Sequence, residues 1–154
     1  MKKAVVLILA AVMAVSMLAC GAPAQEEKVD LKALYAACTG EMTPMMEVDG
    51  DMRRDFMGIA EEDCAQVYTA FAEDGLRTDE LWLIEAKDPE AFKRLKALAE
   101  NRMQAKLEET ESYSPEQYEV VKKGLILENG LYLAFLVAPD GETLQEHWKA
   151  AFEK

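Results

Sequence analysis

The stretch Leu125-Ile-Leu-Glu-Asn-Gly130-Leu-Tyr-Leu-Ala-Phe-Leu-Val-Ala138 predicts more of the fold than any other part of the chain. Asn129-Gly130 is a strong short-range signal for a tight hairpin, because both residue types tolerate a positive φ. Residues 131–138 carry no charge on either face, so we expect a central strand that is covered on both sides. The stretch therefore predicts a hairpin with one buried strand.

A second hairpin is predicted between residues 64 and 87. Its two segments, 64–72 and 81–87, are rich in β-branched and aromatic residues, and Asp74-Gly75 lies between them. The pattern is weaker over 41–59, where we expect at most a short strand around 45–48 and a helical turn at 51–57. The chain thus predicts four mainly antiparallel strands, in hairpins at about 64–87 and 125–138.

Four further segments have helical spacing. The longest runs from about 89 to 111 and starts with Pro89, and a C-terminal helix at about 141–153 aligns Leu144 with Trp148. Shorter helices are expected at 31–38, capped by Asp30, and from Pro115 to about 123. We therefore predict a two-layer α+β domain, with the long and C-terminal helices on one face and the N-terminal helix covering part of the other.

Composition excludes two broad classes of protein. The chain has 154 residues, 17 basic and 29 acidic side chains and a formal net charge of -12. Such an acidic chain has no basic surface for nucleic acid. A hydrophobic content of 51% is too high for a disordered chain, and the length fits one domain.

The N-terminus has the pattern of a bacterial export signal. Lys2 and Lys3 precede an uncharged stretch over 4–19, which is shorter than the roughly 20 residues of a membrane-spanning helix. The stretch ends in Met17-Leu18-Ala19-Cys20, which resembles the lipobox of bacterial lipoproteins. We predict a signal peptide at 1–19, a lipid anchor and flexible tether at 20–29, and one domain of unknown function at 30–154.

A diacylated Cys20 would hold the protein at the extracytoplasmic face of the cell membrane, because two acyl chains give stable anchoring. Two alternatives remain open. One is an uncleaved N-terminal membrane anchor. The other is a secreted protein cleaved near Ala22 or Ala24.

Several segments together resemble an uncharacterised family of short lipoproteins from Gram-positive anaerobes, described only as a domain of unknown function. They are the lipobox at Cys20, Asp30-Leu31, 78–84 (Thr-Asp-Glu-Leu-Trp-Leu-Ile), 113–118 (Tyr-Ser-Pro-Glu-Gln-Tyr) and 130–132 (Gly-Leu-Tyr). The resemblance covers about 31–138. It supports the lipid anchor and the fold, and it implies no activity.

Acidic groups occur at 61–63, at Asp79-Glu80 and at 108–111. We interpret all three as solvated surface, because a catalytic carboxylate pair needs environments that separate the two pKa values. Asp49-Gly50-Asp51 begins like a calcium loop, but arginines occupy 53 and 54 and no glutamate follows at the twelfth position. We predict no calcium site there.

Five of the nine methionines lie between 42 and 57. In an exported protein, the thioether groups of methionines can bind Cu(I). We favour packing, because methionine fills irregular gaps. An adaptable contact surface stays open as an alternative, and Cu(I) binding as a minor one. His147, the only histidine, is expected at the surface, although a dyad with Cys38 or Cys64 stays open. A disulfide between Cys38 and Cys64 also stays open.

The sequence thus predicts a membrane-anchored lipoprotein whose domain is a non-catalytic interaction or ligand-binding module of the cell envelope. We predict no catalytic residue, cofactor or metal, and Cys20 as the lipid attachment site. The partner would be an envelope protein or a small molecule. This role predicts an exposed apolar or aromatic patch. An envelope enzyme acting on cell-wall or peptide substrates is the alternative, and it predicts a deep pocket with perturbed carboxylates.

Overall fold

Five strands form one antiparallel sheet in the computed structural model, which describes residues 28–153. The strand order is β1-β2-β3-β5-β4, so β3 is the central strand and β1 and β4 are the edges. The strands are β1 (Met45–Glu47), β2 (Cys64–Ala72), β3 (Glu80–Ala86), β4 (Leu125–Asn129) and β5 (Tyr132–Val137).

Helices surround the sheet and begin at residues that suit a helix N-terminus. They are α2 (Leu31–Gly40), α3 (Gly50–Met52), α4 (Pro89–Tyr113), α5 (Pro115–Lys122) and α6 (Gly141–Phe152), with a π-helical turn η1 (Arg53–Met57) and a 3-10 turn η2 (Glu61–Asp63). The side chains of Asp30, Asp88, Ser114 and Asp140 accept backbone N–H groups in the first turns of α2, α4, α5 and α6. These caps satisfy donors that a helix leaves free at its start.

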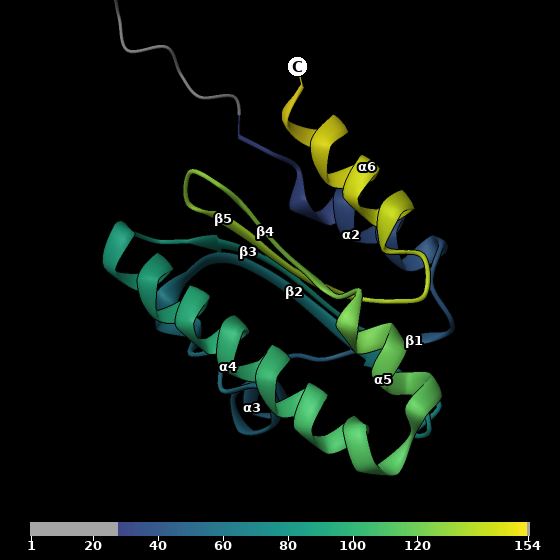
Figure 1. The fold of residues 1–154 in the computed structure, drawn as a ribbon. Coiled ribbons are helices and arrows are strands. Elements are labelled where there is room, and N and C mark those ends of the chain that lie inside the picture. The colour runs from purple at the N-terminus through teal and green to yellow at the C-terminus, as the bar shows by residue number, and fades with distance from the viewer. Residues whose placement is uncertain (1–27, 154) are drawn as a thin grey trace, which may run out of the picture.

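Both faces of the sheet are covered, because the side chains of β3 and β5 are apolar on both faces. On one face Trp82 stacks on Phe135, with 4.7 Å between ring centroids, and α4 covers them through Leu95. On the other face Leu81 and Leu136 pack with residues of α2 and α6. Figure 1 shows α4 on one side of the sheet and α2 with α6 on the other.

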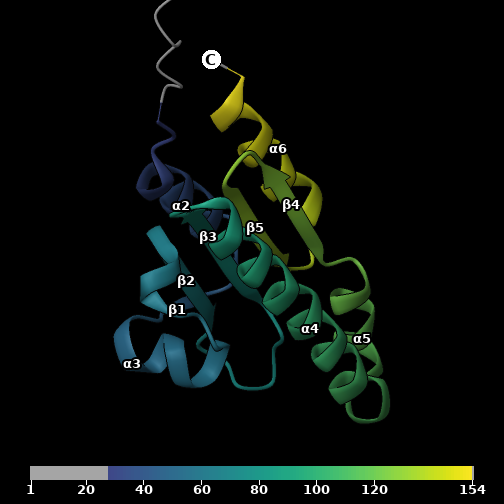
Figure 2. The same ribbon diagram turned by 90° about the vertical axis from the view of Figure 1, so that its left-hand side faces the viewer.

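The prediction that the long and C-terminal helices share one face was wrong. α4 covers the face of Trp82, whereas α6 covers the opposite face through Leu144 and Trp148. The physical reason is that α2, with ten residues, is too short to cover the second apolar face by itself. The domain is therefore a three-layer α+β structure, not a two-layer one (Figure 2).

The predicted strand count was also wrong, since the sheet has five strands and not four. The fifth strand is β1, which lies where we expected at most a short strand, around 45–48, and pairs with β2 from Met45↔Ala72 to Glu47↔Ala70. Both predicted hairpins are confirmed. The β4–β5 turn lies one residue later than predicted, at Gly130-Leu131, because Asn129 is the last residue of β4 and pairs with Tyr132. Gly130 has a positive φ, 57°, at the first turn position. The strand at 132–137 is buried and lies between β3 and β4, so it is an interior strand covered on both faces, as expected.

The described chain starts at one end of the domain, where it contacts the sheet. Lys28 Nζ lies 3.3 Å from Glu85 Oε2, and the N–H of Val29 donates to the Tyr132 hydroxyl over 3.4 Å. Leu31 is fully buried. The predicted signal peptide, Cys20 and most of the tether lie outside the described residues. Within residues 28–153, no helix has both the length and the apolar character needed to cross a bilayer.

Candidate functional site

A buried carboxylate at the start of the central strand is the centre of the most extensive polar network in the structure. Glu80 is the first residue of β3, points toward α4 like Trp82 and Ile84, and is 1% exposed. The Trp82 indole donates from Nε1 to Glu80 Oε1 over 2.8 Å. Arg102 on α4 donates from Nε to Oε1 over 3.1 Å and from Nη2 to Oε2 over 2.8 Å.

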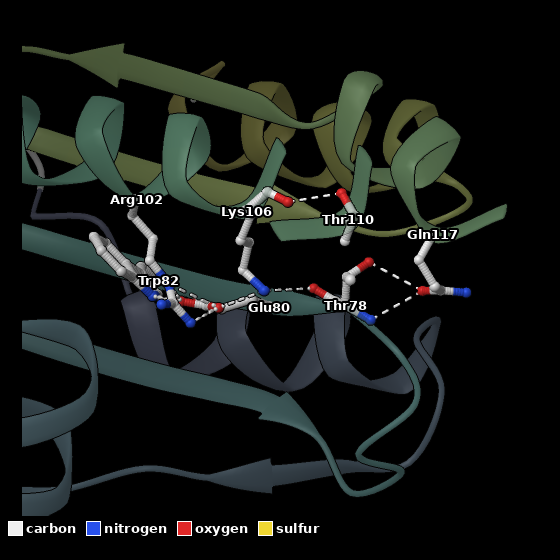
Figure 3. Close-up of polar contacts among 7 residues, drawn as sticks. All are labelled: Thr78, Glu80, Trp82, Arg102, Lys106, Thr110 and Gln117. Atoms are coloured by element: carbon white, nitrogen blue, oxygen red, sulfur yellow. Dashed lines mark hydrogen bonds and ion pairs between the residues drawn. The ribbon is translucent and has the colours of Figure 1, made fainter. Parts of the chain in front are cut away.

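Lys106, one turn after Arg102, extends the network toward the β2–β3 connection. Its ammonium lies 2.8 Å from Glu80 Oε2 and donates to the Thr78 carbonyl over 2.9 Å. The backbone N–H and the hydroxyl of Thr78 in turn donate to Gln117 Oε1 on α5, each over 3.0 Å. Figure 3 shows these contacts joining the start of β3 to α4 and α5.

The network keeps Glu80 ionised. Burial is the largest single influence and by itself would raise the pKa of Glu80. The hydrogen bond from Arg102 and the charges of Lys106 and Arg102 together outweigh burial, so the pKa lies below that of an ordinary glutamate. Asp79, which is also buried, is paired separately with Arg77 through contacts of 3.1 and 3.2 Å.

This arrangement suits a structural role better than a chemical one. Both oxygens of Glu80 already accept hydrogen bonds or ion pairs, and the side chain is closed to solvent. An ionised, fully occupied carboxylate cannot act as a general acid, and it has no free lone pair aimed at a ligand. What the network does is fix β3, α4, α5 and the β2–β3 connection relative to one another.

The prediction that Asp79-Glu80 is solvated surface was therefore wrong, because both side chains are buried and paired. Most of the other acidic residues are exposed, as expected, including Glu61, Glu62 and Glu108. A signal for the network was present in the sequence. The buried side of α4 carries first Leu95 and Ala99 and then Arg102, Lys106 and Thr110. The side of the helix that faces the sheet therefore becomes cationic toward its C-terminal end.

Arg53 forms a second buried polar cluster, in the segment that begins like a calcium loop. Its guanidinium donates from Nε to the Thr69 hydroxyl over 3.1 Å and from Nη2 to the Val48 carbonyl over 3.1 Å. This residue therefore points into the domain and joins η1 to the sheet. Within the described residues, no group of three or more His, Cys, Asp or Glu side chains is arranged to hold a metal ion.

The methionines of 42–57 are divided between different environments. Met57 is buried against the α4 face of the sheet, and Met42 and Met45 pack on the opposite face. Met46 and Met52 are 40% and 43% exposed. Three of the five therefore lie in the core or pack against it, as we favoured, and the segment does not present its thioethers on one face.

The cysteines and the histidine were candidates for a dyad or a disulfide. Cys38 lies in the cluster that contains Trp148 of α6, whereas Cys64 packs on the other face of the sheet, and both are free thiols. Burial raises the pKa of each thiol to about 11, which disfavours the thiolate. His147 is half-buried rather than a surface residue, and its buried Nε2 has no hydrogen-bond partner among the described residues.

A family model described as "Domain of unknown function (DUF4358)" matches residues 39–138. The chain belongs to this family. The DUF4358 match includes all five strands, α4 and α5, and therefore the complete Glu80 network. α6 and most of α2, which cover the other face of the sheet, lie outside it. No curated protein and no solved structure matches the chain.

Proposed function

We propose that the protein is a lipid-anchored, extracytoplasmic lipoprotein and that its DUF4358 domain is a non-catalytic interaction or ligand-binding module of the cell envelope. One observation carries the location: Cys20 directly follows an apolar stretch of 16 residues that ends in the small residue Ala19 and that Lys2 and Lys3 precede. That order is typical of a signal that is cleaved before a lipid-modified cysteine. The lipid would be attached to the sulfur of Cys20.

The way the chain joins the domain fits a short tether. Lys28, Val29 and Leu31 contact the folded domain, so seven residues, 21–27, separate it from Cys20. Seven residues span at most about 25 Å when fully extended. The domain would therefore stay within about one domain diameter of the membrane, with the end at which the chain enters facing the lipid.

The non-catalytic role is supported by the state of the groups that could react. Glu80 is ionised, buried and fully paired, and Asp79 is paired with Arg77. The pKa of both Cys38 and Cys64 is raised to about 11, which is unfavourable for a nucleophilic thiol. These groups stabilise the domain, and binding is the role that its surface can perform.

Metabolic labelling of cells with a palmitate analogue tests the location. The wild-type protein should incorporate label and sediment with membranes, and Cys20→Ser should lose the label and release the protein from the membrane. Cys38→Ser is the matched control, because it removes a cysteine from the domain and should keep both label and membrane binding. An unlabelled wild-type protein, or Cys20→Ser protein that stays on membranes, would refute the anchor.

A further inference from the structure

Two large apolar side chains are left in solvent at the end of the domain far from the tether. Leu76, in the β2–β3 connection, is 73% exposed, and Tyr113, the last residue of α4, is 76% exposed. They are the two most exposed large hydrophobic residues among those that the structure describes. Side chains of this size offer apolar area that a partner could bury.

The network described above brings the two segments to the same end of the domain. Thr78, two residues after Leu76, donates twice to Gln117, four residues after Tyr113. In both Figure 1 and Figure 2 the α4–α5 connection lies at the end opposite the entry of the chain. The entry contacts Glu85, near the end of β3, whereas Thr78 precedes its start, and the strand between them is about 17 Å long.

The two segments that carry these residues are strongly acidic. The segments 73–79 and 108–116 together carry seven acidic side chains and one basic side chain, Arg77, which is paired with Asp79. Glu73, Asp74, Glu111 and Glu116 are all exposed. We call Leu76, Tyr113 and these four carboxylates the distal surface. It combines apolar contact area with a strongly negative rim.

We propose that the distal surface docks a cationic polypeptide segment that carries large apolar side chains. This inference rests on the proposed function and names its partner class. Charge complementarity selects the partner: a basic segment is attracted to the rim, whereas a second copy of the same acidic surface is repelled. Anionic head groups are repelled as well, and a tethered domain turns this end away from the membrane.

Fluorescence anisotropy with the full-length chain in phosphatidylcholine nanodiscs tests the proposal. The probe is a short fluorescein-labelled peptide of alternating lysine and leucine, and empty nanodiscs are the blank. The double variant Leu76→Ser/Tyr113→Ser should bind the probe about tenfold more weakly than the wild type. Both residues are exposed, so we expect the variant to fold, which circular dichroism checks.

Matched controls distinguish docking at the distal surface from nonspecific hydrophobic or electrostatic binding. Met46→Ser/Phe56→Ser removes two other exposed apolar side chains, 40% and 68% exposed, and should leave the affinity unchanged. A peptide of alternating lysine and glutamine should bind more weakly, because it offers charge without apolar contact. Equal loss in the two double variants, or equal binding of the two peptides, would overturn the proposal.

The remaining outcomes assign the surface to another occupant and would also overturn the proposal. One is a dimer, measured by light scattering, that Leu76→Ser/Tyr113→Ser abolishes. Another is sedimentation with phosphatidylglycerol vesicles that depends on the same residues. Cys20→Ser distinguishes the two proposals, because it should bind the peptide normally in detergent even though it fails to reach the membrane in cells.

Discussion

Replacing Glu80 by glutamine removes the charge at the centre of the buried network and keeps the shape of the side chain. Glutamine can still offer one oxygen to Trp82, but its amide group opposes the donors of Arg102 and Lys106. The Lys106 side chain, 9% exposed, is then left with an uncompensated charge. Breaking a buried ion pair in this way costs about 3–5 kcal/mol of unfolding free energy.

Urea denaturation followed by circular dichroism measures this cost. With a slope of about 1–3 kcal/mol per molar urea, the unfolding midpoint of Glu80→Gln should fall by roughly 1–5 M. Glu90→Gln is the control, because it breaks an exposed pair with Lys93 on the same helix, and its midpoint should hardly change. Equal midpoints for the two variants would refute the view that the network holds the domain together.

The pH dependence of the same comparison tests the charge state of Glu80. Its pKa is lowered in the folded protein, so the ionised side chain contributes stability above its unfolded pKa of about 4.3. That contribution is lost as the pH falls through the lower, folded pKa. The difference in stability between the wild type and Glu80→Gln should therefore be largest near neutral pH and shrink below about pH 4. A difference that stays constant down to pH 3 would contradict an ionised Glu80.

Three further substitutions or modifications have defined outcomes. Gln117→Ala removes the acceptor of two hydrogen bonds from the β2–β3 connection and should cost about 1–3 kcal/mol in urea denaturation; a cost near zero would show that water replaces it. Gly130→Ala places a side chain at φ 57° and should lower stability by about 1–2 kcal/mol, which thermal melts can detect. Because the pKa of each thiol is about 11, Cys38 and Cys64 should react slowly with iodoacetamide at pH 8 in the native protein and quickly in guanidinium. Peptide mass spectrometry measures both rates. Native rates equal to that of free cysteine would contradict the burial of the two thiols.

The fold was predictable wherever a local pattern determines structure. The glycine at 130, the cap at Ser114 and the proline at 89 each act within a few residues, and the elements they begin or join lie where the sequence predicts. The layer in which a helix packs is a different kind of property. It depends on which face of the sheet remains uncovered, and no window around 141–153 contains that information.

The polar network could not be predicted from the acidic residues themselves, because adjacent carboxylates on a strand point to opposite faces. Asp79 and Glu80 look like one charged patch in the sequence, yet Asp79 pairs with Arg77 and Glu80 with α4. Local charge density therefore says little about burial. The partner of Glu80, Arg102, lies 22 residues away in the sequence. Only the helical spacing of α4 indicates that Arg102 faces the strand that carries Glu80.

The spacing of α4 places its cations on the face that packs against the sheet. The buried stripe of Ala91, Leu95 and Ala99 continues with Arg102, Lys106 and Thr110, because steps of three or four residues keep the same face inward. Cations on an inward face are tolerated only when an anion of the facing layer neutralises them. The facing strand, β3, has one carboxylate on that side, Glu80. Asp79 points to the opposite face, and the residues after Glu80 are apolar until Glu85. Basic residues at the buried positions of a helix are therefore evidence for a buried carboxylate on the strand that the helix covers.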